Sequence, residues 1–166
     1  VARLSDKIIV LVKGSILDQG KTLQILSSFS IAKKLGLRDL SSFIEATVCN
    51  HAPDGITELD FAGSKLFLPK IDTPLGRKVR LRILAKDITL AIDKPQKISA
   101  LNILKGEVVE IILGSGPGAV IGIKVGNHKL ITRITQRSLN AMDLKLGKIC
   151  FAFLKSVSVA TSDIIV

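Results

Sequence analysis

The feature that most limits how this chain can fold is an internal repeat. Residues 75–91 return in altered form as residues 146–160, with the glycine near the start of each segment preserved. Upstream, residues 59–68 align with residues 123–132 so that apolar positions meet apolar positions. A repeat of this length predicts two similar β units arranged in tandem.

The spacing between the two copies changes along the chain, which places an insertion in the second copy. The spacing is 64 residues at Lys65 and 71 at Gly76, and pairing Lys86 with Lys155 makes it 69. The extra residues fall within 135–146. We therefore expect any specialised feature to lie in the second copy.

Length and composition indicate a globular protein. The chain has 166 residues, of which 47% are hydrophobic and 23% charged, and no apolar run approaches the roughly 18 residues needed to span a bilayer. We expect a soluble fragment or processed chain, since it begins at Val1. Cys49 and Cys150 lack CxxC spacing, which favours free thiols and a cytoplasmic setting. His51 and His128 are too scattered to predict a metal site.

The formal net charge of +10 raises nucleic acid, acidic membranes and small anions as partners. The charge is spread along the chain, and its one stripe consists of Lys78, Arg80 and Arg82, which alternate with apolar residues on a predicted strand. A solvated strand face is the favoured interpretation. With six Phe and no Trp or Tyr, the chain is also poor in platforms for base stacking.

The order of apolar runs and turn residues predicts a mainly β fold of tandem OB-like five-stranded barrels, after a short α/β segment. We expect a hairpin and short helices in residues 1–40, a first barrel in 41–96 and a second in 97–166. The predicted barrel strands are Phe43–Cys49, Ile56–Phe61, Lys65–Leu68, Lys78–Leu84, Ile88–Ile92, Ile103–Leu113, Ala119–Val125, Lys129–Ile134, Lys148–Leu154 and Val157–Val159.

One segment resembles a phosphate-binding loop without meeting its requirements. Gly14 to Thr22 lies between a predicted strand and a predicted helix and contains Gly20-Lys21-Thr22. The first glycine of that motif should stand six positions before the lysine, where this chain has Ser15. We expect a short strand at Ser15–Leu17 here rather than a nucleotide site.

No catalytic triad, Cys–His pair or paired carboxylates stand out, so catalysis is not expected from this chain. The second copy does place small polar groups and one cation at segment ends. Thr135 is a natural N-cap for a helix in the insertion, and Lys155 follows an apolar strand. Such groups suit a tetrahedral oxyanion, although a plain helix cap and a solvated lysine would explain them too. The candidate set is Ser99, Asn102, Thr135, Ser138, Lys155 and Ser156.

Three segments of the second copy, residues 98–109, 130–138 and 146–159, resemble the Mop, or molybdate/tungstate-binding, domain. Residues 1–20 are similar to the last strands of an ABC-transporter ATPase. Together these resemblances imply the C-terminal regulatory (TOBE/Mop) domain of the ATP-binding subunit of a molybdate importer. ATP would be bound only by a nucleotide domain that is absent from this chain.

The resemblance implies a regulatory domain that forms a homodimer and binds molybdate or tungstate where Mop units of two chains meet. Ser99, Thr135, Ser138, Lys155 and Ser156 take the family's ligand positions. The family's Ser-x-Arg-Asn element departs from its pattern here, because Leu101 stands in place of arginine. The implied partner is the importer's membrane permease, at the cytoplasmic face of the membrane, with no cofactor beyond the oxyanion.

Two other functions remain open from the sequence. The loss of arginine at Leu101 favours a regulatory domain that dimerises without binding a ligand. The net charge and the basic stripe leave nucleic-acid binding through the barrel faces as a weaker alternative, which strong salt dependence would reveal.

Overall fold

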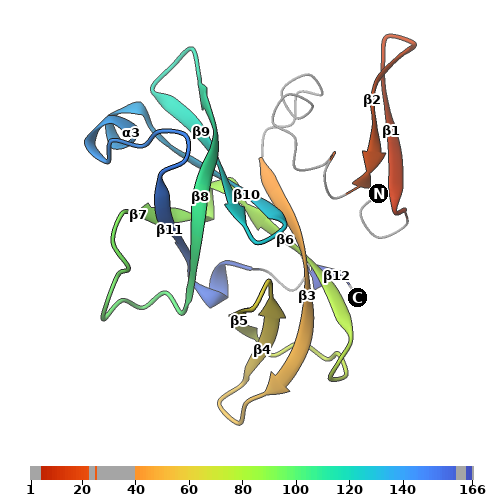
Figure 1. Ribbon diagram of the computed structural model, residues 1–166. Coiled ribbons are helices and arrows are strands. Elements are labelled where there is room, and N and C mark those ends of the chain that lie inside the picture. Colours follow the sequence, from red (N-terminus) through yellow and green to blue (C-terminus); the bar gives the residue numbers. More distant parts are fainter. Residues whose placement is uncertain (1–4, 23–24, 26–39, 160–163, 166) are drawn as a thin grey trace.

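The computed structural model describes residues 5–22, 25, 40–159 and 164–165, which form a hairpin and two five-stranded antiparallel sheets (Figure 1). The predicted mainly β fold is confirmed. The helix expected after the hairpin lies outside the described residues. The hairpin consists of β1 (Lys7–Val12) and β2 (Ser15–Lys21). The first repeat contains β3 (Ser41–His51), β4 (Ile56–Phe61), β5 (Ser64–Pro69), β6 (Lys78–Leu84), the 3-10 turn η1 (Ala85–Asp87) and β7 (Thr89–Ala91).

The second repeat contains the same series with one added helix. Its elements are β8 (Asn102–Leu113), β9 (Gly118–Val125), β10 (His128–Thr135), α3 (Gln136–Ala141), β11 (Ile149–Leu154), the 3-10 turn η2 (Ser156–Ser158) and β12 (Ile164–Ile165). We call residues 41–96 copy one and residues 97–166 copy two. This division of the sequence remains a prediction.

The two sheets have the same strand order, but they exchange their last strands. The sheets run β5-β4-β3-β6-β12 and β10-β9-β8-β11-β7. Strand β7, from copy one, therefore pairs with β11 of copy two, and β12 pairs with β6 of copy one. Sequence analysis placed residues 88–92 among the strands of the first barrel, and it missed β12. Because each sheet needs a strand from the other copy, the two repeats fold as an interlocked pair.

Local details of the backbone also repeat. A β-bulge interrupts β3 after Val48 and β8 after Val108. In copy one the Val48 carbonyl accepts a hydrogen bond from the Gly76 N–H, and in copy two the Val108 carbonyl accepts one from the Gly147 N–H, each 2.8 Å long. Both glycines have positive φ, near 80°, which other residues adopt at a cost. The preserved glycine thus shapes the turn into β6 and β11.

The structure corrects the pairing of Lys155 with Lys86. Both 3-10 turns follow an extended residue, which is Leu84 before η1 and Lys155 before η2, so the spacing stays at 71 residues. Lys155 therefore corresponds to Leu84, and Ser156 to Ala85. The strand predicted at Val157–Val159 is also wrong, because the chain turns there. The sequence alone favoured the wrong pairing because Lys86 and Lys155 are the same residue type in segments that otherwise differ.

Two reciprocal side-chain contacts join the copies. The Asn102 amide accepts a hydrogen bond from the Phe67 N–H (2.6 Å) and donates one to the Phe67 carbonyl (3.0 Å). At the corresponding place, the Ser42 hydroxyl accepts a hydrogen bond from the Ile131 N–H (2.6 Å). Asn102 and Ser42 are both fully buried. Together with one apolar core that spans both sheets, these bonds fix the copies against each other.

Candidate oxyanion site

One part of the candidate set lies around helix α3, the insertion of copy two. Thr135 is its N-cap, as predicted, and its hydroxyl accepts a hydrogen bond from the Ser138 N–H at 3.0 Å. The two hydroxyl groups are 2.8 Å apart. At the other end of the helix, Lys148 Nζ donates to the carbonyls of Met142 (2.8 Å) and Asp143 (2.9 Å). The helix is therefore held at both ends, with the Thr135 and Ser138 hydroxyls at its exposed start.

The second part lies at the turn η2. Lys155 is exposed, whereas the side chain of Ser156 is 7% exposed and its Oγ forms no hydrogen bond within the described residues. A buried hydroxyl without a partner costs about 1–3 kcal/mol. Ser99 is exposed in the segment before β8, and Leu101 is 53% exposed beside it in sequence. A cation and an unpartnered hydroxyl therefore adjoin each other at this end.

Asn102 has a different role from the other predicted residues. Its side-chain oxygen and nitrogen are both engaged by the backbone of Phe67, as described above, and the residue is fully buried. This geometry links the copies and leaves the amide occupied. Sequence analysis missed the contact because Phe67 is 35 residues away in the chain.

Within one chain, the two parts of the set lie at opposite ends of a sheet. Asn102 begins β8 and pairs with Leu154, so η2 follows directly at that end. Leu113 ends β8 and pairs with Ala119, whose neighbour Gly118 pairs with Thr135. Figure 1 shows α3 and the start of β8 far apart along the sheet. The structure therefore brings together Lys155 and Ser156 at one end and Thr135 and Ser138 at the other.

Copy one has apolar residues at three of these polar positions. Leu84 and Ala85 take the places of Lys155 and Ser156 in the matched turns. Counting on from the matched strands β5 and β10, buried Ile71 takes the place of Thr135, and copy one has no helix that corresponds to α3. The fold is thus built in copy one without polar groups at the places of Thr135, Lys155 and Ser156.

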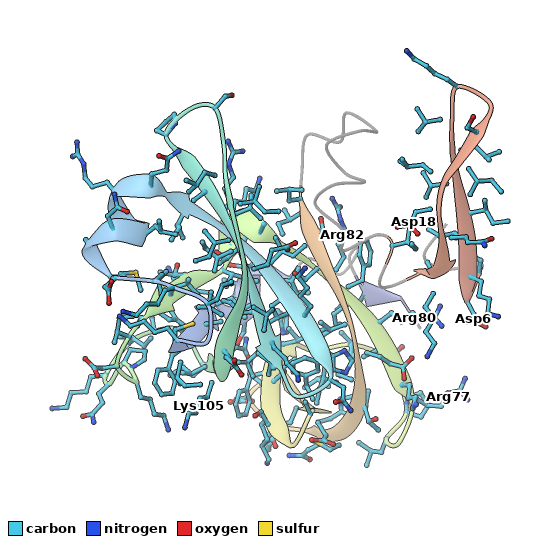
Figure 2. All side chains as sticks on the ribbon, turned by 45° about the horizontal axis from the view of Figure 1, so that its top comes forward. Asp6, Asp18, Arg77, Arg80, Arg82 and Lys105 are labelled. Carbon is cyan, nitrogen blue, oxygen red and sulfur yellow. The ribbon has the colours of Figure 1, made fainter. Side chains whose placement is uncertain are left out.

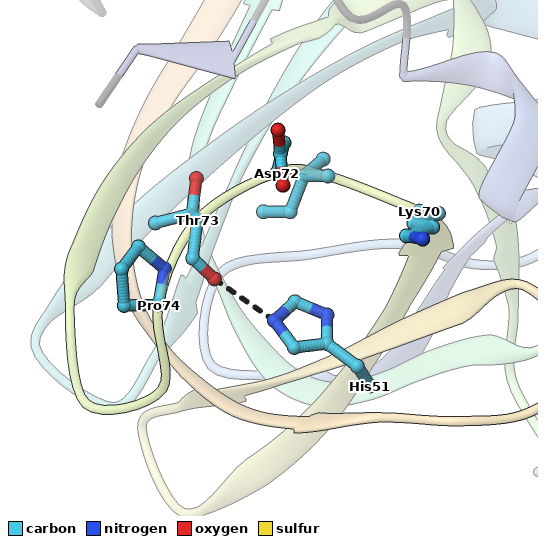
Figure 3. Close-up of a pocket in the computed structure, with 6 residues that line it drawn as sticks. His51, Lys70, Asp72, Thr73 and Pro74 are labelled. Atoms are coloured by element: carbon cyan, nitrogen blue, oxygen red, sulfur yellow. Dashed lines mark hydrogen bonds between the residues drawn. The ribbon is translucent and has the colours of Figure 1, made fainter.

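Copy one has a pocket of about 470 Å³ instead of a helix (Figure 3). Its lining includes His51 and residues 70–74. His51 Nε2 lies 2.8 Å from the Thr73 carbonyl, so it donates that proton, and Nδ1 lies 3.0 Å from the Thr57 hydroxyl. Both ring nitrogens form hydrogen bonds, so His51 stabilises the loop that contains Thr73. The described residues contain no group of three or more metal-ligating side chains.

Two residues of the basic stripe on β6 pair with acidic side chains. Lys78 lies 2.8 Å from Glu45, and Arg80 lies 2.6 Å from Asp6 (Figure 2). Arg82 Nε donates to the Ser41 hydroxyl at 3.0 Å. Lys78 is exposed as predicted, whereas Arg80 and Arg82 are half-buried. The two ion pairs reduce the charge available to a phosphate backbone.

The segment that resembles a phosphate-binding loop forms a strand. The strand predicted at Ser15–Leu17 is confirmed but is longer than expected, because residues 15–21 all belong to β2 and pair with β1. Extended, paired backbone does not present the cluster of free N–H groups that cradles phosphates. No described helix is long and apolar enough to cross a membrane.

Comparisons with known proteins agree with this architecture. Residues 98–161 match the TOBE domain. This segment of copy two is therefore similar to the TOBE domain. The whole chain is 33% identical over 159 residues to the molybdenum import ATP-binding protein ModC of Mesorhizobium japonicum, and 29% identical over 160 residues to ModC of Escherichia coli. These matches include 95% and 96% of this chain but 43% and 45% of the relatives, so the chain spans less than half of their length.

A solved structure shares the fold of this chain. It is the cytoplasmic molybdate-binding protein ModG in a form with molybdate bound, and it aligns with a TM-score of 0.63 at 23% identity. The match covers 75% of this chain and 95% of ModG. The resemblance inferred from the sequence, to the TOBE/Mop part of a molybdate importer's ATP-binding subunit, is confirmed by the family match and by the ModC relatives.

Proposed function

We propose that this chain is the regulatory domain of a molybdate importer's ATP-binding subunit and that copy two binds molybdate or tungstate. The supporting observation is the contrast between the copies. Lys155 and Ser156 replace Leu84 and Ala85 at matched positions, and the buried Ser156 hydroxyl has no partner within the described residues. Polar groups that the fold does not need, one of them unsatisfied, support a ligand site.

The same geometry supports a site shared between two chains. Thr135 and Ser138 lie at the opposite end of the sheet from Lys155 and Ser156, so one chain offers two incomplete halves. In a homodimer the hydroxyl half of one chain meets the lysine half of the other. A dianion is then held by one ammonium and several hydroxyl groups, with Ser99 at the edge of the lysine half.

In the complete protein, we propose that this domain modulates transport. The ATPase domain would precede it, the permease would be its membrane partner, and the domain would lie at the cytoplasmic face of the membrane. The oxyanion is its only proposed ligand, and no catalytic residue is assigned in this chain.

The test is a calorimetric titration of the chain with molybdate and tungstate, with sulfate and phosphate as controls. We expect saturable binding of the first two. Lys155→Leu, which installs the residue of copy one, should weaken binding by about 10- to 100-fold because a charge-assisted contact is lost. Lys86→Leu removes an exposed lysine of copy one and should leave the affinity unchanged.

A second candidate function is dimerisation without ligand binding. The exposed Leu101 favours it, because the family's arginine would supply a guanidinium to the dianion at that position. An absence of heat at millimolar molybdate, with a dimer in sedimentation, would select this candidate and reject the oxyanion site.

A further inference from the structure

The proposed oxyanion site has one assigned cation, Lys155, for a ligand that carries two negative charges. Molybdate and tungstate are tetrahedral dianions. The arginine that the Ser-x-Arg-Asn element would add is replaced by Leu101, which is 53% exposed. A dianion that leaves water for a site with a single ammonium keeps an unbalanced charge, which is unfavourable. A second cation is therefore needed for tight binding.

Arg133 places a guanidinium in the half of the site that contains Thr135 and Ser138. It stands on β10 two residues before Thr135, so both side chains leave the strand on the same face. A Cβ atom at Gly118 would lie 3.4 Å from Arg133 Nε and 3.6 Å from Nη2, so the guanidinium lies against the backbone of Gly118. Gly118 is the cross-strand partner of Thr135. The guanidinium therefore reaches the level of Thr135, about 5 Å away across the strands.

The guanidinium of Arg133 is available to a ligand. Arg133 is exposed, and it forms no ion pair or side-chain hydrogen bond within the described residues. Two other cations near α3 are engaged. Lys148 donates to the carbonyls of Met142 and Asp143, and Lys145 lies 3.1 Å from the Asp143 carboxylate. A guanidinium without a protein partner can form charge-assisted hydrogen bonds to an anion.

Copy one does not need a basic side chain at the corresponding place. Ile56 pairs with Pro69 in copy one as Val120 pairs with Arg133 in copy two, 64 residues further along the chain. Pro69 therefore takes the place of Arg133. Like Lys155, Arg133 is a charged side chain by which copy two departs from the shared fold, and it lies in the half of the site that is without Lys155.

We propose that Arg133 supplies the second positive charge of the oxyanion site and gives the site its preference for dianions over monoanions. This role rests on the proposed function, because the halves that contain Arg133 and Lys155 lie at opposite ends of one sheet. A guanidinium offers a planar fork of donors to two oxygens of one anion. Together with the Lys155 ammonium it balances the charge of molybdate, so the site does not depend on an arginine at position 101.

The test is calorimetric titration of the chain with molybdate and with perrhenate, a tetrahedral anion that carries a single charge. We expect the wild type to bind molybdate more tightly than perrhenate. Arg133→Gln should weaken molybdate binding about 10- to 100-fold, because a charge-assisted contact is lost. Perrhenate binding should weaken less. The preference for molybdate should therefore fall, which a purely structural role of Arg133 would not produce.

Three further variants sharpen the test. Arg133→Lys keeps the charge without the planar fork, so it should keep the preference for molybdate at a weaker affinity. Leu101→Arg in the Arg133→Gln chain should restore molybdate binding, because it returns the family's guanidinium to the other half of the site. Arg77→Gln removes an exposed arginine of copy one and should leave both affinities unchanged. Circular dichroism and the melting temperature establish that each variant is folded.

Other results would overturn the proposal. Wild-type affinity for molybdate in Arg133→Gln would reject the role of Arg133 and leave the proposed function standing, and so would equal weakening of molybdate and perrhenate. A loss of affinity in Arg137→Gln but not in Arg133→Gln would assign the second charge to α3 instead. A wild-type chain that binds neither molybdate nor tungstate would reject the proposed function, and the role of Arg133 with it.

Discussion

The two copies of this chain have the same interior and different surfaces. Buried positions correspond throughout the matched strands, as Val79, Leu81 and Ile83 of β6 do with Cys150, Ala152 and Leu154 of β11. On the outer face, Lys78, Arg80 and Arg82 of copy one correspond to the apolar Ile149, Phe151 and Phe153 of copy two. At the 3-10 turns the difference is reversed, because copy one has the apolar Leu84 and Ala85 where copy two has the polar Lys155 and Ser156. Because copy one shows what the fold alone needs, the departures of copy two indicate function.

The strongest test of the comparison removes the contacts by which the copies hold each other. Asn102→Ala deletes two hydrogen bonds and leaves the Phe67 N–H and carbonyl without partners, so we expect a loss of about 3 kcal/mol in the free energy of unfolding. Ser42→Ala deletes one such bond and should cost about half as much. Urea denaturation measures both, and equal losses would contradict the assigned contacts.

Gly106 and Ala46 test how closely the matched strands β8 and β3 correspond. A Cβ at Gly106 would lie 2.4 Å from Ile123 Cγ2 and 2.7 Å from the Lys124 carbonyl oxygen. Gly106→Ala should therefore cost about 2 kcal/mol in unfolding free energy, although copy one has alanine at the corresponding position. Ala46→Gly should cost about 1 kcal/mol through lost packing and added chain entropy. A neutral Gly106→Ala variant in thermal denaturation would show that β8 can shift away from β9.

Thr135 tests the helix that only copy two has. Thr135→Val keeps the shape of the side chain and removes the cap of α3, so about 1 kcal/mol of stability should be lost. Hydrogen exchange should increase mainly in residues 136–142. An unchanged exchange rate there would mean that Lys148 alone holds the helix.

The smallest predicted effect is a dependence of stability on pH at a contact between the copies. The His128 ring lies 4.7 Å from the Phe61 ring, and burial holds the pKa of His128 below its ordinary value near 6.5. The unfolded chain therefore takes up this proton more readily than the folded chain. Stability should be complete above pH 6.5 and should fall as the pH drops below it. His128→Phe should remove this part of the pH dependence in urea titrations, and a variant with the wild-type profile would assign it elsewhere.

Several features of the fold were predictable because they depend on neighbours in the chain. Alternating apolar residues predicted strand β6 with its observed bounds, and Thr135 before the insertion predicted the N-cap of α3. The two copies of a β unit also followed from local residue types. The alternation of side chains along a strand depends on residues that are close in the chain. Aligning the two copies was therefore enough to predict these features.

What the sequence by itself determined is therefore the repeat, the strands and the polar groups that set copy two apart. Only the tertiary structure decided that β7 and β12 change sheets, that Asn102 binds Phe67, and that Thr135 and Lys155 lie at opposite ends of a sheet. It also corrected the partner of Lys155 from Lys86 to Leu84. These features depend on contacts between residues that are far apart in the chain. Strands pair with the partners that packing of the core brings close, and local sequence does not specify those partners.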